Sequence, residues 1–290
     1  MSITTGALAS AANFNAAFAS KSSANTLAEV QTNEKQVVIK EISTPSTPAS
    51  GYGSVYFKTD GELYVKNDAG TESKVSNQAS STGAPTIQKF TSGSGTYTTP
   101  ANVLYLRVTM VGAGGGGGGS GTSAGGTGGT GGNSTFGTTL LVANGGVGGT
   151  FATNSDGTGG TASLGTGPIG IALSGGYGLP GGYTEPAGGG GGVSPFGGAG
   201  KGGHPSAVNS GFAAISNSGS GGGGASYTPS NGASGNGGGA GGYVCAIISS
   251  PSATYSYSVG AAGTAGTAGT GGAAGGAGGS GYIIVEEFYG

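Results

Sequence analysis

Residues 108–121 read VTMVGAGGGGGGSG, and this stretch decides how the rest of the chain is interpreted. An alternating strand pattern over 103–111 runs directly into six consecutive glycines at 114–119. Glycine loses more backbone entropy on ordering than any other residue, about 0.5–1 kcal/mol more than alanine in a regular element. The stretch is therefore a linker, a silk-like tract, or part of a folded unit that requires the absence of side chains.

The composition argues against simple disorder. Glycine accounts for 73 of the 290 residues, but only 7% of the residues are charged. Disordered segments are usually rich in charge and proline, and this chain has little of either. A net charge of -2 indicates neither nucleic acid nor an anionic membrane as a partner.

Other features of the sequence narrow the class further. There is no run of about 18 apolar residues, so we expect no membrane insertion. The first residues lack a basic region before their apolar stretch, so we expect no secretory signal. Cys245 is the only cysteine, which excludes an intramolecular disulfide and a cysteine-based zinc site.

Charge and strand patterns divide the chain into four parts. Phe14 and Phe18 permit a short helix, while Asp60-Gly61 lies between two β-rich runs and predicts a hairpin. A meander of this size is too small to be stable alone, so it is a spacer module that requires copies of itself. The predicted parts are an N-terminal attachment or assembly segment (1–50, short helical or extended), a small β-meander (51–76), a linker (77–86) and a glycine-rich domain (87–290).

Strand patterns flank the glycine tracts of the last part. They cover 87–90, 95–99, 103–111, 243–248, 254–259 and 281–289. Between 260 and 281 glycine recurs at every third position, which is the period of the polyproline II helix. Such a helix has no internal hydrogen bonds, so its backbone groups need partners outside it. Several glycine-rich segments packed side by side would supply them, because backbones without Cβ atoms can approach closely.

The order of these features resembles a known family. TYTTPANVLYLRVTMVGAGGGGGG, then GGGAGGYVCAIISSPSATYSYSVGAAG and GGSGYIIVEEFYG, are similar to the glycine-rich tip domains of bacteriophage tail fibres, also found in phage-derived fibres of predatory bacteria. The resemblance covers about residues 90–290. It implies an all-β fold in which a jelly-roll-like β-sandwich base carries an inserted lattice of polyglycine II helices, and it implies a homotrimer. GSVYFKTDGELYVKNDAG resembles a small module of phage fibres, whereas the N-terminal part departs from the tip-domain family and leaves the mode of attachment open.

Segments between the glycine tracts are the candidate binding loops. A bundle of straight glycine helices has to reverse direction, and we expect these interruptions to form its turns. They are 133–144, 150–156, 161–174, 177–187, 193–196, 204–220 and 225–234. Aromatic side chains give a large contact area at low entropy cost, which favours them as receptor-binding residues. The candidates are Tyr177, Tyr183, Phe196, Phe212 and Tyr227; the alternative is that each packs over the lattice or between subunits.

Few residues could support catalysis. A glycosidase needs two carboxylates at a defined separation, and the distal region offers only Asp156 and Glu185 besides the adjacent Glu286-Glu287. His204 is the only histidine and has only Ser206 near it in sequence. The glycine blocks lack the helix and acidic residue of a nucleotide-binding fingerprint. We expect no enzyme, cofactor or metal site.

These observations lead to one function and one alternative. We expect a fibre-tip adhesin on a virion, or on a bacterial surface fibre, that binds an outer-surface protein or glycan. Its other partners would be its own copies and virion proteins contacted by the N-terminal segment. The alternative is a structural appendage, such as a head fibre or decoration protein, without a specific receptor.

Overall fold

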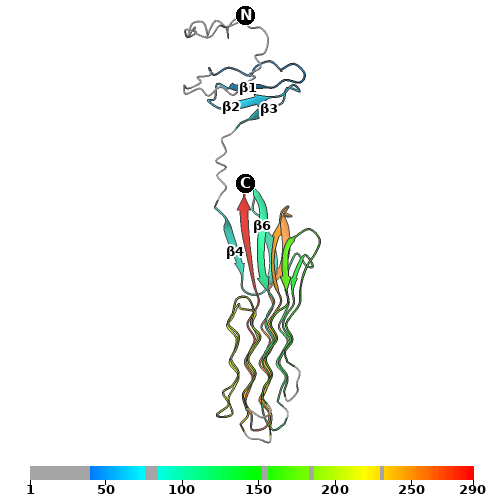
Figure 1. The fold of residues 1–290 in the computed structure, drawn as a ribbon, viewed down its shortest axis with the longest axis vertical. Helices are drawn as coiled ribbons and strands as arrows, with labels where there is room; N and C mark the ends of the chain where they lie inside the picture. The colour runs from blue at the N-terminus through cyan, green and yellow to red at the C-terminus, as the bar shows by residue number, and fades with distance from the viewer. Residues whose placement is uncertain (1–39, 76–83, 124, 152–155, 183–185, 229–231) are drawn as a thin grey trace, which may run out of the picture. The chain divides into compact units, whose positions relative to one another are not determined.

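A computed structural model describes residues 40–75, 84–123, 125–151, 156–182, 186–228 and 232–290 (Figure 1). Across these ranges there are thirteen strands, all paired antiparallel, and no helix, so the all-β prediction is confirmed. The chain divides into two compact units, of which the first ends at Asn77 and the second begins at Gln78. The helix expected near Phe14 and Phe18 falls outside the described residues.

The first unit contains a three-stranded sheet in the order β1-β2-β3. Its strands are β1 (Ser54–Phe57), β2 (Leu63–Lys66) and β3 (Glu72–Lys74). Gly61 has φ of +81°, and its N–H donates to the Lys58 carbonyl at 2.9 Å. This glycine permits the left-handed turn at Asp60-Gly61, and the predicted hairpin is confirmed.

The second unit contains two five-stranded sheets. One has the order β10-β11-β6-β13-β4, and the other has the order β5-β12-β7-β8-β9. The strands are β4 (Thr86–Phe90), β5 (Ser94–Thr98), β6 (Val103–Val111), β7 (Ser134–Phe136), β8 (Leu141–Ala143), β9 (Ala162–Leu164), β10 (Ile169–Leu173), β11 (Tyr243–Ile248), β12 (Thr254–Ser258) and β13 (Tyr282–Tyr289).

Both sheets contribute to one hydrophobic core. Leu106 and Met110 of β6 and Ile283 of β13 are fully buried, and they cluster with Tyr97 of β5 and Phe136 of β7. Alternate residues of β6 point into this core, as the alternating pattern at 103–111 predicts.

Two of the expected turns are strands instead. The segments 133–144 and 161–174 contain β7, β8, β9 and β10, so the prediction that they are simple reversals between glycine helices is wrong. Short runs such as STF, LVA and IGIAL are rich in residues that favour a pleated surface. Each run pairs with its neighbours and extends one of the two sheets.

Glu287 of β13 is buried beside the same core and links the sheets. Its carboxylate accepts hydrogen bonds from Gln88 Nε2 at 2.6 Å, from the Tyr97 hydroxyl at 2.9 Å and from the Tyr289 hydroxyl at 3.2 Å. The Thr86 hydroxyl also donates to it. Burial raises the pKa of the Tyr97 hydroxyl, and its hydrogen bond to Glu287 raises that pKa further.

The glycine-rich segments continue from the strands and lie side by side below the sheets in Figure 1, in what we call the glycine array. Segment 112–121 follows directly from β6 and lies inside the array. Its backbone hydrogen-bonds to six segments, which are 125–132, 144–150, 219–226, 233–242, 260–269 and 272–280. Segments 219–226 and 233–242 each hydrogen-bond to six neighbouring segments as well, so these three segments are the interior of the array.

Hydrogen bonds from each segment change partner with a period of three. Gly115 and Gly118 donate to 233–242, Gly116 donates to 125–132, and Gly114 and Gly117 donate to 272–280. Three directions of bonding per turn leave no room for large side chains. Accordingly, the three interior segments contain only Gly, Ala, Ser and Asn.

Segments on the perimeter contain fewer glycines because part of their surface faces solvent. In 260–269 the N–H groups of Gly263, Gly266 and Gly269 donate to segment 112–121 at 2.9 Å. Thr264 and Thr267, which lie between these glycines, are exposed. A segment that hydrogen-bonds to more neighbouring segments therefore has more glycines per turn.

Candidate functional site

The end of the array far from the two sheets is formed by turns between glycine segments (Figure 1). One is the turn at 204–208, which joins segments 198–203 and 209–215. Another is the turn at 269–272, which joins segments 260–269 and 272–280.

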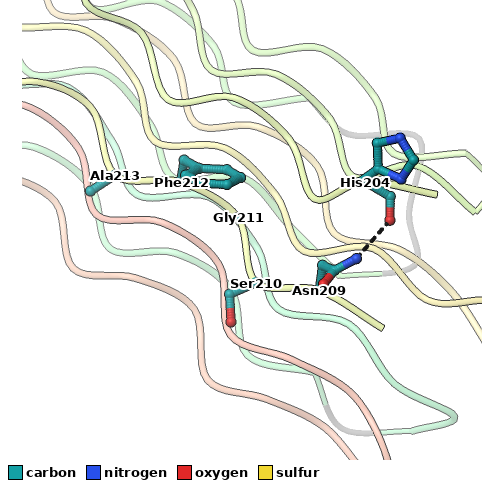
Figure 2. Close-up of a pocket in the computed structure, with 6 residues that line it drawn as sticks. All are labelled: His204, Asn209, Ser210, Gly211, Phe212 and Ala213. Atoms are coloured by element: carbon teal, nitrogen blue, oxygen red, sulfur yellow. Dashed lines mark hydrogen bonds between the residues drawn. The ribbon is translucent and has the colours of Figure 1, made fainter. Parts of the chain in front are cut away.

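Phe212 is the candidate residue that lies beside a hollow lined by several kinds of polar side chain. Its side chain is 60% exposed and lies beside an open hollow of about 470 Å³ (Figure 2). The hollow is lined by His204, Asn209, Ser210, Gly211, Phe212 and Ala213. The lining therefore combines an aromatic ring with imidazole, amide and hydroxyl groups.

Local hydrogen bonds fix the polar residues of this hollow. Asn209 Nδ2 donates to the backbone carbonyl of His204 at 3.1 Å, as Figure 2 shows, and to that of Ala207 at 3.4 Å. His204 Nδ1 accepts the backbone N–H of Ser206 at 3.2 Å and lies 2.8 Å from its hydroxyl. A neutral His204 then carries its proton on Nε2, which is a donor for a bound molecule.

Segment 209–215 holds this hollow in place. The Phe212 N–H donates to the carbonyl of Lys201 at 2.9 Å, and the Phe212 carbonyl accepts the N–H of interior Gly223 at 3.0 Å. The Gly211 N–H donates to Ala274 at 3.0 Å. The ring is therefore presented by a backbone that is bonded on three sides.

Tyr177 is also exposed, but it lies on a different part of the perimeter. It belongs to segment 174–180, between the N–H groups of Gly175 and Gly178 that donate to segment 156–161. Tyr177 and Phe212 both lie along extended segments, so the prediction that they lie in turns is wrong. Extended segments on the perimeter also expose side chains along their length, because part of their surface faces solvent.

Phe196 and Tyr227 do not project from the far end either. Phe196 lies at the end of the array next to the sheets, with its ring centroid 6.0 Å from that of Tyr243 and 6.1 Å from that of Tyr282. Tyr227 is only 6% exposed, which fits the packing alternative for this residue. Tyr183 lies outside the described residues.

The pattern of aromatic residues does not predict the exposed aliphatic side chains of the array. Leu179, Val193 and Ile215 are each at least 60% exposed. Ile215 follows Phe212 by three residues, so the period that orders the glycines could have predicted that both face the same side.

Of the residues considered for catalysis, His204 and Ser206 are brought together, but no carboxylate is among the residues that line the hollow beside His204. Asp156 has one buried carboxylate oxygen without a hydrogen-bond partner, and Glu185 falls outside the described ranges. No cluster of three or more His, Cys, Asp or Glu residues suited to a metal is present where the chain is described. Within those same ranges, no helix has the length and apolar character needed to cross a membrane.

Comparisons with known proteins give no match, whether with protein-family models, with curated protein sequences or with solved structures. The resemblance to phage fibre tips therefore stays a prediction.

Proposed function

We propose that the chain is the tip adhesin of a phage-type fibre and that it binds a bacterial surface receptor through exposed side chains of the glycine array. In this proposal the two five-stranded sheets are a β-sandwich base, the array is a polyglycine II lattice, and the protein is a homotrimer. Its place is a virion or a related bacterial surface fibre, and its N-terminal segment attaches it there.

The observation that carries the proposal is the exposed Phe212 on a rigid support. An aromatic ring that stays largely in solvent beside a hollow with donors and acceptors is typical of a recognition surface. The surrounding hydrogen bonds favour binding because little conformational freedom remains to be lost.

The receptor is a protein or glycan of the bacterial outer surface. His204 Nε2–H, the Ser210 hydroxyl and the Asn209 amide can exchange hydrogen bonds with either, while the Phe212 ring can contact an apolar face of a sugar or side chain. No Asp, Glu, Lys or Arg side chain lines the hollow, so binding would depend weakly on salt.

A cell-binding assay tests this function. Fluorescently labelled full-length protein is incubated with a panel of bacterial strains, and bound fluorescence is measured by flow cytometry. We expect binding to some strains, and we expect Phe212→Ala to weaken it about tenfold, because a central aromatic contact is worth on the order of 1–2 kcal/mol. Ser163→Ala, on the exposed face of β9, is the matched control and is expected to bind as the wild type does.

Pretreatment of the cells separates the two receptor classes. Periodate oxidation abolishes binding to a glycan, and protease digestion abolishes binding to a protein. If no strain binds the wild type, the adhesin proposal fails and the structural-appendage alternative is favoured. If Phe212→Ala binds as tightly as Ser163→Ala, the hollow is not the binding site.

A further inference from the structure

The two sheets of the second unit differ sharply in the chemistry of their outward faces. On the sheet β5-β12-β7-β8-β9, one cross-strand row of outward residues reads Ser163, Val142, Thr135, Ser258 and Ser94. A row of this kind is typical of an antiparallel sheet with one face in water. This sheet serves as an internal reference for the other.

On the sheet β10-β11-β6-β13-β4, the corresponding outward row reads Ile171, Cys245, Thr109, Ile284 and Lys89. The adjacent row begins with Ile169 and Ile247 on the same face. Ile169 is 75% exposed and Ile171 is 53% exposed. A sheet that is apolar on both faces indicates that both faces are covered in the assembled protein.

Charges on this outward face largely cancel. Arg107 Nη2 donates to Glu286 Oε1 at 2.6 Å, across neighbouring strands β6 and β13. Arg107 and Glu286 belong to the adjacent row, which reads Ile169, Ile247, Arg107, Glu286 and Ile87. A highly charged partner would find little complementary charge here, whereas another neutral apolar face would fit.

The apolar surface continues onto the end of the array beneath the sheet. Phe196 contacts Tyr243 and Tyr282, which lie at the lower ends of β11 and β13 on the outward face. Phe196 therefore lengthens the face beyond the strands.

The apolar side chains of the face supply much of the area that a stable interface needs. Ile87, Ile169, Ile171, Leu173, Ile247 and Phe196 are between 39% and 75% exposed. Their exposed parts amount to on the order of 500 Å², at roughly 150–200 Å² for a large apolar side chain. Stable interfaces bury about 800 Å² per partner, so these side chains alone supply more than half of that area.

We propose that the outward face of the sheet β10-β11-β6-β13-β4 is the surface through which copies of this chain associate with one another. The inference rests on the proposed homo-oligomer and assigns its interface. A second copy is the occupant that fits, because another copy presents the same apolar residues and the same paired Arg107 and Glu286.

Mass measurement of full-length variants tests the interface. Light scattering coupled to size exclusion is expected to give a multiple of 26.8 kDa for the wild type. Ile171→Glu is expected to give a folded monomer, because burying a charge against an apolar partner opposes association. Ser163→Glu is the matched control, since Ser163 is also an exposed outward residue on an edge strand, and it is expected to keep the wild-type mass.

Circular dichroism of Ile171→Glu verifies that the monomer is folded. If this variant does not fold, Ile169→Lys answers the same question at a more exposed position of β10. A monomeric wild type overturns both the oligomer and the interface. A wild-type oligomer that both β10 variants leave intact overturns the interface alone, and cell binding measured on the same samples tests the adhesin function separately.

Discussion

Replacing Gly116 by alanine tests whether the glycine array is a packed structure. A Cβ atom at Gly116, in the middle of the interior segment 112–121, would overlap the carbonyl group of Thr264 on the neighbouring segment. Both partners are backbone, so no side chain can rotate away. The neighbouring segment 260–269 would have to move outward.

The structure sets the size of the effect. Moving that segment stretches the bonds from Gly263 to Gly114 and from Gly266 to Gly117, both 2.9 Å long. A buried backbone group that loses its partner costs about 1–3 kcal/mol. Adding about 1–3 kcal/mol for overpacking gives an expected loss of about 2–6 kcal/mol in the free energy of unfolding. Since whole domains are stable by about 5–15 kcal/mol, the variant would be severely weakened.

Gly190 provides the matched control within the same array. It lies in the perimeter segment 187–193, its φ is not in the left-handed region, and a Cβ there would meet only Leu179 Cδ1 at 3.5 Å. That is ordinary van der Waals contact. Gly190→Ala is therefore expected to be neutral, or more stable by about 0.4–1 kcal/mol, because alanine restricts the unfolded chain.

Guanidinium unfolding followed by circular dichroism measures both variants. We expect a large drop in the midpoint for Gly116→Ala and none for Gly190→Ala. Equal midpoints for the two variants would refute close backbone packing as the reason for the interior glycines.

Two further predictions concern carboxylates. Glu287→Gln should lower the unfolding free energy by about 1–3 kcal/mol, because an amide nitrogen would face the donors that now surround the carboxylate, and a thermal midpoint equal to wild type would contradict this. In the first unit, hydrogen bonds from Tyr56 and Lys58 lower the pKa of Glu72 from its ordinary 4.5. Its stabilising contribution is therefore present above the ordinary pKa and is lost as pH falls through the lowered value. Tyr56→Phe should move the Glu72 pKa, measured by NMR titration, back toward 4.5; an unchanged pKa would show that the Tyr56 contact is not its cause.

The sequence predicts the strands that begin or end the glycine-rich part better than the strands inside it. The segment 103–111 alternates over nine residues and lies in the centre of its sheet, so periodicity alone identifies it. By contrast, β7, β8 and β9 have three residues each, too few for a period to be visible. Their pairing depends on neighbours that are distant in sequence.

The candidate site was less predictable for a related reason. An aromatic residue between glycine tracts can lie in a turn, along a segment or beneath other residues, and sequence does not distinguish these. Tyr227 is buried against the turn that holds Gly232, where a Cβ would overlap its ring. Phe212 is exposed because its segment lies on the perimeter, which only the full set of hydrogen bonds reveals.

The three-residue repeat of hydrogen-bond partners means that the array can change length only in fixed steps. Adding one residue to a segment would turn every later N–H toward the wrong neighbour and bring side chains to face the interior. Adding three residues to each segment restores every partner and, at the roughly 3.1 Å per residue of the proposed polyglycine II lattice, lengthens the array by about 9 Å. The distance between the sheets and the far turns is therefore quantised, and the reach of the molecule can be adjusted without altering the chemistry at either end.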